Sequence, residues 1–168
     1  MSNYVAPRSL DQAAEILRTG DVTLLAGGTD LMPQSRSGRT QLRPTLMNIR
    51  RIPELHGVSE TGGTIRIGAL TTISDLRNSA LVRELLQALW QACDHFASDQ
   101  IRNAGTLGGN ICNASPAGDT LVPLLVLDAR VVLAARPNGA IKTRTVPLAD
   151  FLLGPGKTAR AADELLVA

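Results

Sequence analysis

Apolar positions in the first third of the chain form one helical stripe and two short runs, with glycines between them. After the capping box Ser9–Gln12, four apolar residues recur at helical spacing: Leu10, Ala13, Ala14 and Leu17. The apolar runs 22–26 and 44–49 have the length of buried strands, and residues 29–30 can begin a brief helix between them. A strand, a helix and a strand in so few residues predict a small lobe with a parallel sheet.

The pattern changes after residue 55. Apolar runs flank Gly62–Gly63 and the turn 136–139, which predicts two antiparallel hairpins. From Ser79 onwards we expect a single long helix, because its apolar residues follow a 3.6-residue period: Leu81, Leu85, Leu86, Leu89, Trp90 and Cys93. A short helix is expected after Asp119, whose side chain can cap it.

The last residues of the chain, ELLVA at 164–168, are apolar after Glu164 and predict the start of a strand. The chain as a whole therefore predicts an α+β fold in two units. We expect residues 1–55 to form a small N-terminal α/β lobe and residues 56–168 to form a central antiparallel lobe with helices.

The stretch TLGGNICNASPAGDT, residues 106–120, combines two adjacent glycines with amide, hydroxyl and carboxylate side chains. Gly108 and Gly109 have no Cβ, so the backbone there can bend sharply or lie against another molecule. We expect a long structured loop, which either has no ligand or surrounds one rich in hydroxyls and phosphates. The second alternative is favoured, because loops longer than roughly 12 residues in compact domains are usually functional or disordered.

A second glycine turn, LLAGGTDL at 24–31, follows a predicted strand and precedes a predicted helix. Backbone N–H groups at such a turn favour phosphate, although a tight turn without a ligand explains the same residues. The spacing differs from the G-x-G-x-x-G of a Rossmann fold. GPGKT at 154–158 is not a Walker A loop either, because Phe151 stands where that loop needs its first glycine.

Charge and composition exclude several kinds of partner. The chain has 17 basic and 15 acidic residues without a basic run, and aromatic residues make up only 2%. This is not the pattern of a nucleic-acid-binding surface. No apolar stretch reaches the roughly 18 residues of a membrane span, and the N-terminus lacks a signal-peptide pattern. We therefore expect a cytoplasmic protein, with Cys93 and Cys112 as buried free thiols.

Side chains suited to catalysis do not form a recognisable set. His56 and His95 are far apart in sequence, and the end of a helix accounts for His95, although a catalytic pair remains the alternative. No group of Cys, His and carboxylate residues has the spacing of metal ligands. We expect no catalytic and no metal-binding residue, so a bound cofactor would carry the chemistry.

Taken together, AGGTDL at 26–31 and IRNAGTLGGNICNASPAGD at 101–119 resemble the flavin-binding medium subunit of molybdenum hydroxylases, the family that contains xanthine and carbon monoxide dehydrogenases. The resemblance runs from YVAPRSLDQAAEIL at 4–17 to ELLV at 164–167 and covers essentially the whole chain. It implies an FAD-binding fold of the PCMH, or vanillyl-alcohol oxidase-like, type. In that fold FAD lies between the small N-terminal lobe and the antiparallel central lobe.

The resemblance also implies which residues bind FAD. Residues 26–31 would hold the pyrophosphate with backbone amides, and residues 106–110 would hold it from the other side. Phe96 would contact the cofactor, with a purely structural role in the core as the alternative. The full expected set is Leu25, Ala26, Gly27, Gly28, Thr29, Asp30, Leu31, Phe96, Thr106, Gly108, Gly109, Asn110, Asn113, Gly118, Asp119 and Leu166.

The function implied by the resemblance is electron transfer. In this family a molybdopterin subunit oxidises a substrate, and two [2Fe-2S] centres in a small subunit pass electrons to FAD and then to NAD, a quinone, oxygen or a carrier protein. FAD would bind in this chain, and molybdopterin and [2Fe-2S] in partner subunits. Family members continue through a C-terminal lobe that this sequence does not include. Two alternatives stay open: a truncated flavin domain with only an assembly role, and a sugar-nucleotide (enolpyruvoylglucosamine) reductase-like flavoprotein.

Overall fold

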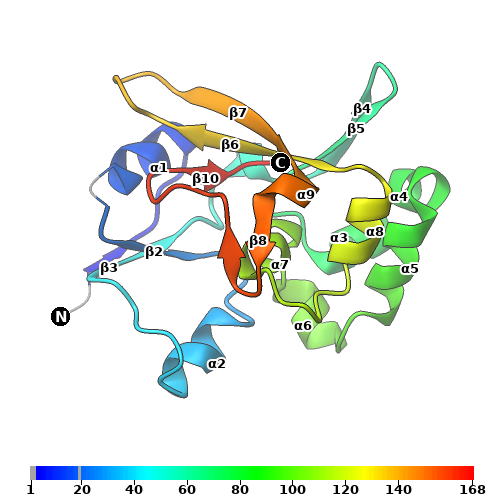
Figure 1. The fold of residues 1–168 in the computed structure, drawn as a ribbon, viewed down its shortest axis with the longest axis horizontal. Coiled ribbons are helices and arrows are strands. Elements are labelled where there is room, and N and C mark those ends of the chain that lie inside the picture. Colours follow the sequence, from blue (N-terminus) through cyan, green and yellow to red (C-terminus); the bar gives the residue numbers. More distant parts are fainter. Residues whose placement is uncertain (1–2, 19) are drawn as a thin grey trace.

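The computed structural model describes residues 3–18 and 20–168. Within these ranges the strands form two three-stranded sheets and two two-stranded ones, and in Figure 1 most of the short helices lie together on the right of the view. No helix in these two ranges is long and apolar enough to span a membrane.

The N-terminal sheet is parallel throughout. Its order is β1-β3-β2, with β1 at Asn3–Val5, β3 at Thr45–Asn48 and β2 at Val22–Leu25. Helix α1 (Leu10–Leu17) leads from β1 to β2, and helix α2 (Leu31–Arg36) leads from β2 to β3. The predicted parallel pair is confirmed, whereas β1 was not predicted. That strand has only three residues, and two of them are exposed, so it carries no apolar run.

The start of α1 follows the predicted capping box only in part. Ser9 Oγ accepts a hydrogen bond from the N–H of Gln12 at 3.2 Å, as expected for a helix cap. The Gln12 side chain, however, accepts from the N–H of Arg8 at 2.9 Å instead of from Ser9. The helix then buries one face, formed by Ala13, Ala14 and Leu17, as the apolar spacing predicts.

The antiparallel strands lie after residue 55, as predicted. The hairpins are β4 (Val58–Thr61) with β5 (Thr64–Ile67), and β6 (Arg130–Ala135) with β7 (Lys142–Pro147). The C-terminal strand β10 (Leu165–Leu166) pairs with β6, which gives a sheet of order β10-β6-β7. The 3-10 helix η1 (Pro53–Leu55) precedes the first hairpin. The second hairpin is followed by α9 (Leu148–Phe151), β8 (Leu152–Gly154) and β9 (Lys157–Thr158).

The helices between the hairpins differ from the prediction. They are α3 (Ile73–Asn78), α4 (Ala80–Leu85), α5 (Gln87–His95), α6 (Asp99–Ala104), α7 (Leu107–Asn113) and α8 (Leu121–Val126). The single long helix expected from Ser79 is wrong, because Leu86, with φ −126° and ψ 52°, separates α4 from α5. Helix α8 begins after Thr120 instead of being capped by Asp119.

The expected long loop at 106–120 is also wrong in its first half. Residues 107–113 form α7, and Thr106 caps it by accepting a hydrogen bond from the N–H of Gly109 at 3.1 Å. Glycine has low helix propensity, so two adjacent glycines indicated a loop. Tertiary contacts decide otherwise, since the N–H of Gly108 donates to the carbonyl of Ala69 at 2.8 Å.

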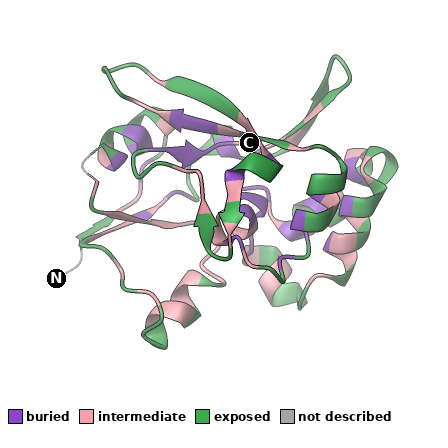
Figure 2. Cartoon of the chain, in the orientation of Figure 1, coloured by how far each residue is buried: buried purple, intermediate pink, exposed green. Residues whose placement is uncertain are grey.

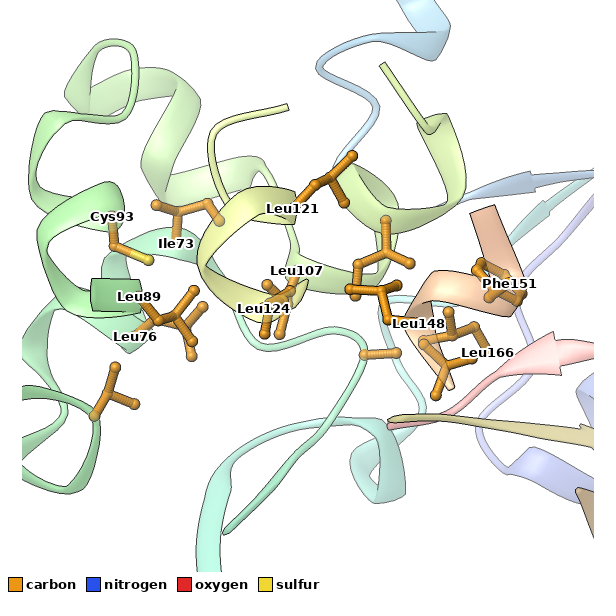
Figure 3. Packing of buried hydrophobic residues seen from close by; sticks show 14 of the residues in the cluster. Ile73, Leu76, Leu89, Cys93, Leu107, Leu121, Leu124, Leu148, Phe151 and Leu166 are labelled. Carbon is orange, nitrogen blue, oxygen red and sulfur yellow. The ribbon is translucent and has the colours of Figure 1, made fainter. Parts of the chain in front are cut away.

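Two apolar clusters form the interior, seen as the purple segments of Figure 2. The first lies among α3, α5, α7, α8 and α9, where Leu76, Leu89 and Phe151 are fully buried (Figure 3). The second joins α1 and β3 to Leu70 and Leu165. This second cluster has members on both sides of the predicted boundary between residues 55 and 56, and the division into two units stays a prediction.

Phe151→Ala tests the first cluster. Phe151 is completely buried, so its truncation removes apolar contacts and leaves a cavity, at a cost of about 3–5 kcal/mol in the free energy of unfolding. Leu153→Ala is the matched control, because Leu153 is 65% exposed and its loss is expected to change that free energy by at most about 0.5 kcal/mol. Denaturant unfolding of both variants measures the difference, and equal losses would contradict the assignment of the core.

Candidate functional site

Helix α7 forms the floor of a cavity of about 480 Å³. One wall, here called the first wall, comprises residues 26–34, the glycine turn and the start of α2. It runs along the floor from end to end: Thr29 lies near Gly105, just before α7, and Gln34 Nε2 is 3.5 Å from Oδ1 of Asn113, at its last residue. Two segments about 80 positions apart in sequence thus line one site.

Another part of the cavity lining, here called the second wall, comes from residues 156–166. The N–H of Gly156 donates to the carbonyl of Ala114 at 3.0 Å, just after α7. At the other end of α7, Ala69 accepts from Gly108 and donates to the carbonyl of Val167 at 3.1 Å. The second wall therefore also follows α7 from one end to the other, and it carries Leu165 and Leu166 into the cavity lining.

Two glycines allow this close assembly. A Cβ on Gly27 would lie 2.0 Å from the carbonyl oxygen of Ala104, and one on Gly108 would lie 2.7 Å from Cβ of Ala69. Any side chain at either position would force the backbones apart. Gly109 differs, because its Cβ would meet only the hydroxyl of Thr106, at 2.8 Å. Gly27 and Gly108 thus hold the site together, whereas Gly109 keeps side-chain volume out of the cavity.

The first wall presents unpaired backbone donors. Within residues 3–18 and 20–168, the N–H groups of Gly27, Gly28, Thr29 and Asp30 have no hydrogen-bond partner, although all four residues line the cavity. Gly28 has φ +76°, a left-handed conformation that glycine adopts without strain. Successive free N–H groups in such a turn form a concavity that binds anions. This arrangement suits a phosphate group.

The floor contributes differently from what the resemblance implies. The N–H groups of Gly108, Gly109 and Asn110 are already engaged, by the Ala69 carbonyl, the Thr106 hydroxyl and the Thr106 carbonyl. In this structure α7 therefore offers side chains in place of backbone donors. Asn110 Oδ1 accepts from the hydroxyl of Thr120 at 2.7 Å, which fixes the side chain and leaves its amide N–H groups for a ligand.

Most of the predicted site residues meet in this cavity. Thirteen of the sixteen line it: Ala26, Gly27, Gly28, Thr29, Asp30, Leu31, Phe96, Thr106, Gly108, Gly109, Asn110, Asn113 and Leu166. Leu25, Gly118 and Asp119 are not among the lining residues. A Cβ on Gly118 would lie 3.0 Å from the Leu121 side chain and 3.1 Å from the carbonyl oxygen of Ser115. This glycine therefore allows tight packing within its own turn.

Sequence reasoning missed several lining residues, in the second wall and elsewhere, among them Gln34, Arg43, Cys112, Gly156, Thr158 and Arg160. The position of Gln34, one turn after the glycine motif on a helix, is a usable signal for its place in the first wall. Nothing in GPGKTAR marks the second wall. Cys112, expected to be buried, is only partly buried, whereas Cys93 is buried as predicted.

Glu164 lies in the second wall, is 8% exposed and forms an ion pair there. Its carboxylate accepts from Arg144 Nε at 2.5 Å and Nη2 at 2.8 Å, and from the N–H of Ala161 at 2.8 Å. The hydrogen bond from Arg144 is the main reason that the pKa of Glu164 lies below its usual value. This ion pair fixes the segment that carries Arg160.

The thiol in the cavity is not a nucleophile at neutral pH. Burial raises the pKa of Cys112 to about 11, and the nearby charge of Arg160 only partly opposes that rise. Across the described ranges, no three His, Cys, Asp or Glu side chains gather as a metal site would require.

A glycine turn with unpaired N–H groups, a helix with two adjacent glycines, and a second wall that carries both leucines and Arg160 line one cavity, an arrangement that suits a phosphate-containing cofactor. Residues 1–168 match the family model described as the FAD binding domain in molybdopterin dehydrogenase. The chain belongs to this family of FAD-binding domains.

Similar proteins include the carbon monoxide dehydrogenase medium chain of Hydrogenophaga pseudoflava, 39% identical over 98% of this chain and 56% of the relative. The xanthine dehydrogenase FAD-binding subunit of Escherichia coli O157:H7 is 38% identical over 99% of this chain and 56% of the relative. The solved carbon monoxide dehydrogenase from Hydrogenophaga pseudoflava, in a form lacking the Mo-pyranopterin moiety, has a TM-score of 0.91 and 38% identity, and is matched over 99% of this chain and 57% of that one. The chain thus spans 56–57% of these proteins.

Glu164→Gln tests the ion pair behind the second wall. Because the pKa of Glu164 is lowered by folding, its stabilisation is present above the usual value of 4.5 and is lost as the pH falls through the lower folded value. We expect the free energy of unfolding of the variant to be roughly 2 kcal/mol lower at neutral pH. The difference from the unmodified chain should shrink as the solution is acidified below 4.5. Denaturant unfolding at several pH values measures this, and a difference that is constant with pH would contradict it.

Proposed function

We propose that this chain binds FAD in the cavity over α7 and serves as the flavin electron-transfer unit of a molybdopterin-dependent hydroxylase or dehydrogenase. The observation that carries the proposal is the set of four unpaired N–H groups at residues 27–30 in the cavity lining. A pyrophosphate is the part of FAD that such donors recognise.

Each wall has a defined task in this proposal. The turn at 27–30 binds the pyrophosphate, and Thr29 and Asp30 add a hydroxyl and a carboxylate suited to sugar hydroxyls. The amides of Asn110 and Asn113 meet further polar groups of the cofactor from the floor. Phe96 and Leu166 supply an apolar surface for the ring system. Leu25, Gly118 and Asp119 do not line the cavity and have no direct task here.

FAD supplies the redox chemistry, because it can take up electrons singly and release them in pairs. The chain binds the cofactor, orients it and excludes water from part of its surface. Electrons would reach it from [2Fe-2S] centres in a small partner subunit, which in turn receives them from a molybdopterin subunit. The final acceptor would be NAD, a quinone, oxygen or a carrier protein, and the complex would work in the cytoplasm. The names of the relatives, medium chains and FAD-binding subunits of dehydrogenases, support this assignment.

Gly109→Val tests the cavity assignment. The branched side chain would enter the space over α7, where even an added Cβ would lie 2.8 Å from the Thr106 hydroxyl. We expect this to reduce bound FAD per chain by at least about tenfold. Flavin content after purification and saturation with FAD measures the effect. The circular dichroism spectrum should stay unchanged, since Gly109 approaches no other backbone segment.

Ala117→Val is the matched control for that experiment. Ala117 is exposed, follows α7 closely in sequence and does not line the cavity, so introducing the same valine side chain there should leave the flavin content unchanged. A folded Gly109→Val variant with full flavin content would rule out this location for the cofactor.

A further inference from the structure

The charged residues that line the cavity are Asp30, Arg43 and Arg160. Arg43 has an acidic partner, because its Nη1 lies 3.6 Å from the carboxylate of Asp21. Arg160 makes no salt bridge with any carboxylate in the described part of the chain. Arg160 is thus a half-buried cation that lines the cavity and has no carboxylate within salt-bridge distance, although its charge acts on Glu164 from farther away, and such a cation can receive an anion.

Arg160 is held in place by backbone groups. Its Nη1 donates to the carbonyl of Glu164 at 2.6 Å and to that of Ala161 at 3.1 Å. The nearest carboxylate in sequence, that of Glu164, is already bound to Arg144 and to the N–H of Ala161. Nε and Nη2 of Arg160 donate to no acceptor within residues 3–18 and 20–168, which leaves three N–H bonds for a ligand.

Arg160 and the free amides line the same cavity from two different segments of the chain. Arg160 belongs to the second wall and lies close enough to Cys112, on α7, for its charge to act on that thiol. The free N–H groups of residues 27–30 belong to the first wall, which also contacts α7 and the residues before it. An anion that lies over α7 can therefore meet N–H donors from one wall and a guanidinium from the other.

We propose that Arg160 pairs with the pyrophosphate of the bound cofactor, opposite the amides of residues 27–30. This inference rests on the proposed FAD function and adds a positioning residue that neither glycine motif contains. The pairing is charge-assisted, and the planar guanidinium can contact two phosphate oxygens at once. The pyrophosphate carries the same charge in oxidised and reduced FAD, so the pairing should affect affinity and leave the midpoint potential alone.

The test compares four forms of the purified, flavin-free chain: the unmodified protein, Arg160→Gln, Arg160→Lys and Arg66→Gln. Arg66 is exposed on β5 and does not line the cavity, so Arg66→Gln removes the same charge elsewhere. FAD is titrated into each form by fluorescence, and the midpoint potential of the bound flavin is then measured by redox titration. Thermal unfolding confirms that each variant is folded.

We expect Arg160→Gln to raise the Kd for FAD by roughly tenfold to a hundredfold. Arg160→Lys should lose less affinity, Arg66→Gln should bind like the unmodified chain, and the midpoint potential should be the same in all four. An unchanged Kd in Arg160→Gln overturns the proposal, as does an equal loss in Arg160→Lys, which would indicate a structural role. A weakened Kd with a shifted potential also overturns it, because the charge would then face the flavin ring. Failure of the unmodified chain to bind FAD would instead refute the proposed function itself.

Discussion

The site depends on the contact between Gly27 and the carbonyl oxygen of Ala104. Gly27 follows strand β2 and Ala104 is the last residue of α6, and a Cβ on Gly27 would lie only 2.0 Å from that oxygen. The contact sets the glycine turn directly beside the start of α7. Without it, the free N–H groups of residues 27–30 would not face the same space as Asn110 and Asn113.

The two glycine motifs differ in their backbone donors, although both were expected to hold the pyrophosphate. The turn at 27–30 keeps its donors free, as an anion site requires. The N–H groups of residues 108–110 already donate to Ala69 and Thr106. Gly108 therefore allows close packing, and Gly109 leaves space in the cavity. The electrostatic complement comes from the second wall, where the Arg144–Glu164 pair fixes the segment that presents Arg160.

Much of the fold could be predicted, because the information is local. Apolar runs of strand length and turn glycines are enough for the β2–α2–β3 unit and for both hairpins. The helix break at Leu86 could not be predicted, since the apolar period continues through it. Helix α7 was missed for a related reason: intrinsic propensity opposes a helix at Gly108 and Gly109, and contacts with Ala69 and Thr106 override it.

The site divides in the same way. The first wall and the floor carry motifs, so most of their lining residues were found from the sequence. The second wall follows α7 because the N–H of Gly156 donates to the carbonyl of Ala114 and because β10 pairs with β6. Pairings between residues so far apart in sequence produce no local residue pattern that could predict them. Leu166 was identified there through resemblance alone, and Arg160 through the structure.

The most direct test of the account is a calorimetric titration of the purified, flavin-free chain with FAD and, separately, with riboflavin, which lacks the pyrophosphate. If the free amides of residues 27–30 and their surroundings recognise phosphate, FAD should bind with one molecule per chain. Riboflavin should bind at least about a hundredfold more weakly, because it forgoes several charge-assisted hydrogen bonds. Equal affinity for the two compounds, or no binding of FAD, would contradict the assignment of this cavity as a pyrophosphate site.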